Sequence, residues 1–176
     1  MASINNPHNP EPAADAATKK ITLKAADNHC FEVEESVAME FTTVKNFFDD
    51  NSETLTGTVI PLPNVYAVHL SKIITYCRQH LKFRAESVPE KERKAYDANF
   101  VKELSNEQLR EMILASNYLN FRSLLDMLNQ ATADLIKNKS VEFVREFFGI
   151  ENDFTEEEEQ RLRQENAWAF EGLDQD

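Results

Sequence analysis

The chain has 176 residues, of which 41% are hydrophobic, and its formal net charge at pH 7 is -12. This size allows one domain, or one domain with a helical extension, around a buried core. Only 3 Gly and 6 Pro residues favour a helix-rich fold with few strands. The negative charge argues against nucleic acids and anionic membrane surfaces as partners.

The sequence contains no stretch near the roughly 20 apolar residues of a membrane span. Residues 1–18 are rich in Asn, Pro and Ala, and we expect them to form a disordered tail without a hydrophobic leader. Cys30 and Cys77 lie in apolar patterns without a CxxC motif. This predicts reduced core thiols in the cytosol or nucleus, and a disulfide between them is the less favoured alternative.

The folded part is expected to begin with a β-hairpin. Apolar and polar residues alternate over residues 21–25 and again over 31–33, which is typical of half-buried strands. Between them, Asp27 and Asn28 tolerate positive φ, so a tight turn can form without glycine.

The next segments alternate between helix and extended chain. Residues 34–50 have helical spacing in two short pieces, and residues 51–58 are polar, which predicts a mobile loop. Prolines in residues 59–65 confine that segment to a sheet edge. An apolar stripe over residues 70–81 predicts a helix. Residues 82–94 are charged without periodicity, so we expect a linker loop there.

Two helical patterns meet at Asn117-Tyr118-Leu119-Asn120 with almost no loop between them. Ser105 and Gln108 are spaced as a capping box for the first helix. Such a junction fixes the angle between the elements on its two sides. The apolar stripes are Leu109, Met112, Ile113 and Ser116 before the corner, and Phe121, Leu124, Leu125 and Leu128 after it.

The C-terminal third has more large apolar residues than its short helices can cover. The second stripe extends to Ile136 and is expected to stop at Asn138. Ser140 and Gly149 bound a further helix, after which Ile150 is available to fold back, and the segment 155–158 is a capping box. We expect another surface to cover the excess apolar residues Phe148, Ile150, Phe154, Trp168 and Phe170.

No catalytic, cofactor or metal site is predicted. Glycine occurs only at positions 57, 149 and 172, which excludes glycine-rich phosphate loops. The four histidines are scattered, with neither cysteine at a metal-ligand spacing. The acidic run Glu156–Glu159 is better explained as a solvated helix start than as a calcium site.

Several long motifs resemble the S-phase-kinase-associated adaptor family of SCF (cullin-RING) ubiquitin ligases. These motifs occur in the same order as in the family, and together they extend from Lys19 to Glu171. The motifs are KKITLKAADN, FEVEESVAME, VIPLPNV, ILASNYLNFRSLLDM and GIENDFTEEEEQRLRQENAWAFE.

The resemblance implies a helix-rich α/β (α+β) fold and a noncatalytic adaptor. A POZ/BTB-like, cullin-binding domain with a small sheet would span residues 19–128, and F-box-binding helices would span residues 110–171, before a disordered tail at residues 172–176. The partners implied are a cullin scaffold and F-box proteins, and indirectly a RING subunit and a ubiquitin-conjugating enzyme. The expected location is the nucleus and cytoplasm.

Site residues follow from the matching motif positions. Val44, Asn117 and Tyr118 would face the cullin. The residues expected at the F-box surface are Leu124, Leu125, Leu128, Ile136, Phe143, Val144, Phe147, Phe148, Ile150 and Trp168.

The chain also departs from the family pattern. Where the family usually has GKTPEEIRKTF, residues 138–148 are NKSVEFVREFF, so that Phe143 and Phe147 add aromatic area. We interpret this as a divergent, plant-like paralogue with a restricted or altered F-box repertoire. The rival interpretation is a POZ-like interaction module outside ubiquitin ligases, which would lack the C-terminal F-box helices.

Overall fold

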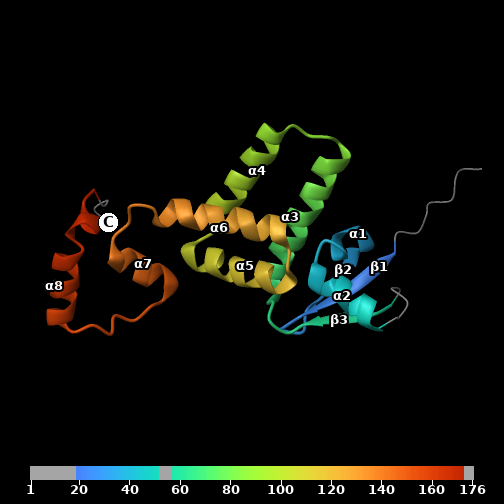
Figure 1. Ribbon diagram of the computed structural model, residues 1–176. Helices are drawn as coiled ribbons and strands as arrows, with labels where there is room; N and C mark the ends of the chain where they lie inside the picture. Colours follow the sequence, from blue (N-terminus) through green and yellow to red (C-terminus); the bar gives the residue numbers. More distant parts are fainter. Residues whose placement is uncertain (1–18, 52–56, 173–176) are drawn as a thin grey trace, which may run out of the picture.

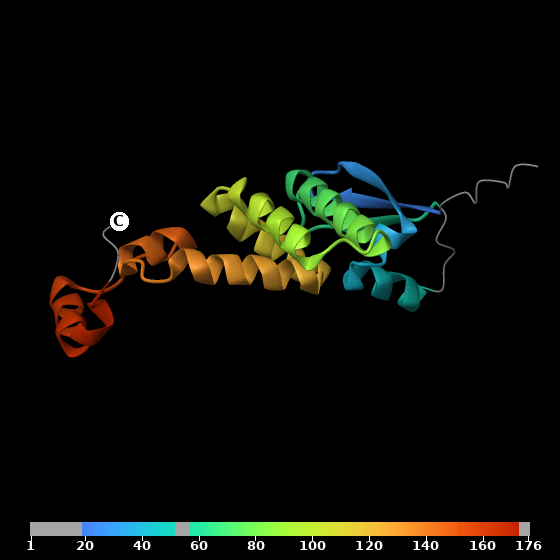
Figure 2. The same ribbon diagram turned by 90° about the horizontal axis from the view of Figure 1, so that it is seen from above.

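The computed structural model describes residues 19–51 and 57–172. The tail predicted at 1–18, residues 173–176 of the predicted C-terminal tail and residues 52–56 of the predicted loop lie outside this part of the chain. Within it, helices predominate over a small three-stranded sheet. This confirms the predicted helix-rich α+β class. Figure 2 shows an elongated molecule with the sheet at one end and the last helices at the other.

The central strand of the sheet is β1 (Lys20–Ala25). It pairs antiparallel with β2 (Cys30–Glu34) and parallel with β3 (Val59–Leu62). Alternate residues of β1 are buried in the core, as the period-two pattern predicts. β3 lies at an edge of the sheet, which is where its proline is tolerated.

A tight turn joins β1 to β2 and completes the predicted hairpin. Asn28 has a φ of 67°, and its backbone amide donates to the Ala25 carbonyl at 3.0 Å. An asparagine side chain tolerates this left-handed conformation, so the turn needs no glycine.

Helices α1 (Glu35–Ala38) and α2 (Thr42–Asn51) provide the crossover that the parallel β1–β3 pair requires. After β3 the chain enters α3 (Ala67–Ala85). The predicted stripe of α3 faces the core, where Leu70, Ile73, Ile74 and Cys77 are buried.

The two cysteines have different environments, although both thiols are free. Burial raises the pKa of the Cys77 thiol to about 12, so this thiol stays protonated. Cys30 is exposed at the first position of β2. The prediction of a core thiol is therefore wrong for Cys30, because an edge strand leaves its first residue uncovered.

The structure contradicts the linker loop predicted at residues 82–94. α3 and α4 (Glu90–Lys102) leave only residues 86–89 as a turn. Helical ion pairs support this charged stretch, as between Lys94 and Glu90 at 2.7 Å. α4 contains no buried residue, so it lacks the apolar stripe by which a sequence reveals a helix.

Aromatic side chains hold α4 against α3. The Tyr76 ring lies 5.0 Å from the Phe100 ring and stacks on His80 at 4.2 Å, measured between ring centroids. Asp97 of α4 accepts a hydrogen bond from the Tyr76 hydroxyl at 2.9 Å and lies 2.8 Å from Nε2 of His80. Burial and the Asp97 charge raise the pKa of Tyr76, so its hydroxyl remains a donor.

The remaining helices lead away from the sheet (Figure 1). α5 (Asn106–Leu119) and α6 (Arg122–Ile136) lie side by side. α6 continues toward α7 (Val141–Phe148), α8 (Glu156–Glu165) and the short 3-10 helix η1 (Ala167–Phe170) at the far end of the molecule.

Caps predicted from the sequence bound these helices. Ser105 begins α5 with a capping box, and Thr155 begins α8 with another. Ser140 accepts a hydrogen bond at the start of α7, and Gly149 ends that helix at a φ of 65°. The Ile150 amide folds back to donate to the Arg145 carbonyl at 2.8 Å, although the residue remains 57% exposed.

Candidate functional site

The junction between α5 and α6 is a tight corner. α5 ends at Leu119, its cap residue Asn120 has the left-handed conformation, and only Asn120 and Phe121 separate α5 from α6. The buried ring of Phe121 packs edge-on against Phe41, with the centroids 5.5 Å apart. The predicted near absence of a loop is confirmed. The break itself falls at Asn120 and Phe121, because Asn117 and Tyr118 still belong to the last turn of α5.

Two threonines at the start of α2 fix this corner from the side. Thr43 Oγ1 donates to the Tyr118 carbonyl at 2.6 Å, and Thr42 Oγ1 donates to the Asn120 carbonyl at 3.2 Å. The last carbonyls of a helix lack partners within it, so these hydroxyls satisfy the end of α5. The role of the two threonines could not be predicted from the sequence, since no local spacing relates them to the corner.

The residues predicted to face a cullin differ in accessibility. Asn117 is exposed and Tyr118 is half-buried, whereas Val44 has 0% exposure. The Val44 side chain packs in the core in this structure, and its role as a cullin contact stays a prediction. Leu114, one turn before Tyr118, is 61% exposed and adds apolar area that the prediction omitted. In the sequence, Leu114 stands out because it falls off the buried stripe of α5.

The residues predicted to face an F-box protein divide into three groups. Phe148, Ile150 and Trp168 are 45%, 57% and 74% exposed. Phe154, which was predicted only to be one of the excess apolar residues, is 47% exposed and lies at the same end of the molecule. The half-buried members are Ile136, Phe143 and Val144. The buried members are Leu124, Leu125, Leu128 and Phe147.

The four buried members do not present a surface to a partner in this structure. Leu124 and Leu128 are completely buried on the inner face of α6, and Leu125 is 8% exposed. Phe147 is 2% exposed. In this structure all four have a packing role, because helical spacing identifies an apolar face without telling whether the protein itself covers it. Their contact with an F-box protein stays a prediction. We name the exposed set of Phe148, Ile150, Phe154 and Trp168 the terminal aromatic surface.

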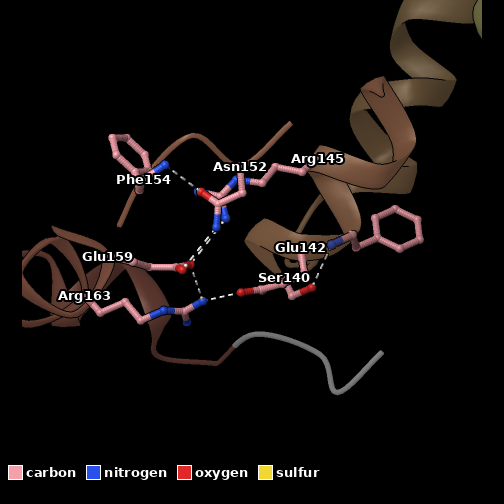
Figure 3. A network of polar contacts seen from close by, with 8 residues as sticks. Ser140, Glu142, Arg145, Asn152, Phe154, Glu159 and Arg163 are labelled. Carbon is pink, nitrogen blue, oxygen red and sulfur yellow. Dashed lines mark hydrogen bonds and ion pairs between the residues drawn. The ribbon is translucent and has the colours of Figure 1, made fainter. Parts of the chain in front are cut away.

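A network of charged groups ties α8 to α7 (Figure 3). The Glu159 carboxylate accepts hydrogen bonds from Arg163 at 3.2 Å, Asn152 at 3.2 Å and Arg145 at 3.3 Å. These hydrogen bonds lower the pKa of Glu159, and the one from Arg163 contributes most. Arg163 also contacts the Glu142 carboxylate on α7. α8 has no buried residue, and these polar contacts join it to α7.

The acidic run Glu156–Glu159 has a structural role. Glu158 completes the capping box with Thr155, and the Thr155 backbone amide lowers the pKa of the Glu158 carboxyl. Across residues 19–51 and 57–172, no group of three or more His, Cys, Asp or Glu side chains is placed to hold a metal ion. Among the helices of the same residues, none is both long and apolar enough to cross a membrane.

Comparison with known proteins identifies two matching family models, one on either side of the corner. The model for the tetramerisation domain of the Skp1 family matches residues 19–82. The model for the dimerisation domain of the same family matches residues 122–169.

Curated plant proteins are similar over almost their whole length. SKP1-like protein 1A of Arabidopsis thaliana is 44% identical over 163 residues, which cover 88% of this chain and 99% of the relative. SKP1-like protein 20 of Oryza sativa subsp. japonica is 44% identical over 178 residues, covering 90% of this chain and 99% of the relative. The resemblance inferred from the motifs is thus confirmed, and the chain belongs to the Skp1 family.

Proposed function

We propose that this protein is a noncatalytic adaptor of an SCF ubiquitin ligase that bridges a cullin scaffold to F-box substrate receptors. Membership of the Skp1 family supports this proposal. The structural observation that carries it is a pair of separate accessible surfaces, one at the α5–α6 corner and one over α7 to η1. A RING subunit and a ubiquitin-conjugating enzyme would act through the scaffold, and they rather than this chain would transfer ubiquitin.

The terminal aromatic surface is the proposed site for F-box proteins. Large apolar side chains that stay exposed are typical of protein interfaces. Phe148, Ile150, Phe154 and Trp168 are each at least 45% exposed. Buried aromatic anchors dominate the energy of many interfaces, so a helical partner covering these side chains would gain most of its affinity here.

The corner is the proposed site for the cullin. The exposed Leu114 and Asn117 and the half-buried Tyr118 lie on the last two turns of α5. The hydroxyls of Thr42 and Thr43 hold the backbone at the end of this helix. A surface built on a fixed helix end loses little conformational entropy when a partner binds.

We further propose that the protein acts in the nucleus and cytoplasm. Both cysteines are free thiols, and one of them is exposed, which suits a reducing compartment. A fluorescent fusion expressed in plant cells tests this part of the proposal, and exclusion from either compartment would contradict it.

A reconstitution experiment tests the bridging role. We expect the purified protein to join a plant cullin N-terminal domain and an F-box protein into one ternary complex on size-exclusion chromatography. Binding of neither partner at low salt would favour the rival interpretation, a POZ-like module outside ubiquitin ligases. Amide hydrogen exchange provides a second readout, because amides after about residue 139 should exchange more slowly when the F-box protein is bound than when the protein is alone.

A further inference from the structure

Helix α7 carries part of the terminal aromatic surface. The Arg110 side chain joins this helix to α5. Arg110 projects from α5 to the C-terminal end of α7. Its Nη1 donates to the carbonyl of Phe147 and, at 3.3 Å, to the carbonyl of Glu146. These carbonyls lie in the last turn of α7, where the helix dipole favours a cation.

The same arginine also contacts α7 through an aromatic ring. The Arg110 guanidinium carbon lies 5.9 Å from the centroid of the Phe147 ring, and Phe147 is the only buried residue of α7. Beside them, a hollow of about 240 Å³ is lined by residues of both helices, Phe143 among them. We call Arg110, Phe143 and Phe147 the α5–α7 joint.

The joint lies directly behind residues of the terminal aromatic surface. Phe148 follows Phe147 in the chain, and the Phe147 and Phe148 rings meet edge to face with centroids 4.8 Å apart. The Ile150 amide donates to the Arg145 carbonyl at 2.8 Å, so Ile150 also follows the end of α7. A change in the tilt of α7 at the joint would therefore move Phe148 and Ile150 together.

We propose that the α5–α7 joint selects among F-box proteins by setting the orientation of α7, with Arg110 as its positioning residue. This inference rests on the proposed function. Phe143 and Phe147, the aromatic departures from the family pattern, belong to the joint and not to the contact area. The departures from the family pattern at Phe143 and Phe147 then affect F-box binding indirectly, because they determine the positions of Phe148 and Ile150 at the surface.

The test compares three variants against a panel of F-box proteins. Arg110→Met keeps the apolar stem but removes the donors. Arg110→Lys keeps the charge but replaces the planar guanidinium, whose Nη1 donates to both carbonyls and whose carbon lies near the Phe147 ring, by a compact ammonium. The matched control is Arg78→Met, since Arg78 also donates to a backbone carbonyl, that of Glu32 at 3.5 Å, but lies on α3 away from α7. Affinities for each F-box protein and for the cullin are measured by isothermal titration calorimetry.

We expect Arg110→Met to weaken the binding of the preferred F-box protein about tenfold, which is the size of effect expected for the loss of a charged hydrogen bond. Less preferred F-box proteins should change less or gain affinity, cullin binding should be unchanged, and Arg110→Lys should recover part of the loss. Amides at the end of α7 should exchange faster in unbound Arg110→Met than in the unmodified protein, while those of α5 should not.

A double-mutant cycle with Phe148→Ala separates positioning from contact. If Arg110 acts by placing Phe148, the two losses of affinity are less than additive. Additive losses, or equal weakening of every F-box protein, would overturn the inference. If the unmodified protein binds F-box proteins but Arg110→Met binds them with the same affinities, only this inference fails. If the unmodified protein binds none, the proposed function itself fails.

Discussion

Thr43 and Tyr118 are joined by a hydrogen bond in which the Thr43 hydroxyl donates to the Tyr118 carbonyl at 2.6 Å. The bond connects the start of α2 to the end of α5, and both residues are partly buried. It therefore ties the sheet end of the molecule to the corner that begins the C-terminal helices.

Removing this bond should loosen the corner. Thr43→Val keeps the side-chain shape but leaves the Tyr118 carbonyl without its donor, so we expect a loss of about 1 kcal/mol in the free energy of unfolding. Urea denaturation followed by circular dichroism measures the change. The matched control is Thr75→Val, because Thr75 Oγ1 also donates to a backbone carbonyl but lies exposed on α3. Equal effects of the two substitutions would contradict a special role of the corner.

Tyr118→Ala should separate the two proposed binding activities. Truncation of a hot-spot tyrosine predicts a loss of about 2 kcal/mol in the free energy of cullin binding. F-box binding should be unchanged, because the terminal aromatic surface lies at the other end of α6 (Figure 1). Titration calorimetry with each partner measures both. Tyr66→Ala is the control, since Tyr66 is 57% exposed before α3, and equal loss for both partners would indicate misfolding.

A flexible insertion after Asn120 should preserve each binding event but reduce ubiquitin transfer. Only two residues, Asn120 and Phe121, lie between α5 and α6, so added glycine and serine residues would let the two surfaces reorient. The measurement is substrate ubiquitination by a reconstituted ligase, with the same insertion placed in residues 86–89 as control. Unchanged transfer would show that the rigidity of the corner has only a structural role.

Ser116→Ala should stabilise the protein. The Ser116 hydroxyl has 0% exposed area and lacks a hydrogen-bond partner in the described part of the chain. Removing an unsatisfied buried polar group should raise the free energy of unfolding by about 1 kcal/mol. Ser123→Ala on the exposed side of α6 corrects for the difference in helix propensity, which is the same in both substitutions. A gain no larger than that of Ser123→Ala would contradict the prediction.

The attachment of α8 to α7 should weaken in acid. The pKa of Glu159 is lowered in the folded state from its ordinary value of 4.5, first by the hydrogen bond from Arg163. The stabilisation is therefore complete above pH 4.5 and is lost as the pH falls through the folded-state pKa. NMR shifts of the α8 amides against pH measure this loss.

Two glutamine variants isolate the contribution of Glu159. Glu159→Gln should loosen α8 at neutral pH and abolish most of the acid-dependent change. Glu157→Gln should leave that change intact, because Glu157 is exposed and has no ion-pair partner in residues 19–51 and 57–172. Glu158 also has a lowered pKa through Thr155, so part of the titration at the helix start should persist in Glu159→Gln. An unchanged titration in that variant would contradict the role of the network.

The local structure and the family could both be predicted from the amino-acid sequence. The hairpin at Asn28 and the helix boundaries at Ser105, Gly149 and Thr155 follow from short-range chemistry, since a cap and its partner lie within a few residues of each other. The surplus of apolar residues after Phe147 was also visible, because no local element is long enough to cover them.

Tertiary structure alone decided which apolar residues are available to a partner. Val44 and Leu124 share helical spacing with accessible residues, yet both are completely buried, because burial depends on elements distant in the chain. Helix α4 could not be predicted for the same reason. It has no apolar stripe of its own, and its Asp97 is held by Tyr76 and His80 of α3. The roles of Arg110 and Thr43 could not be predicted from the sequence either, since each donates to a backbone carbonyl that only folding brings near.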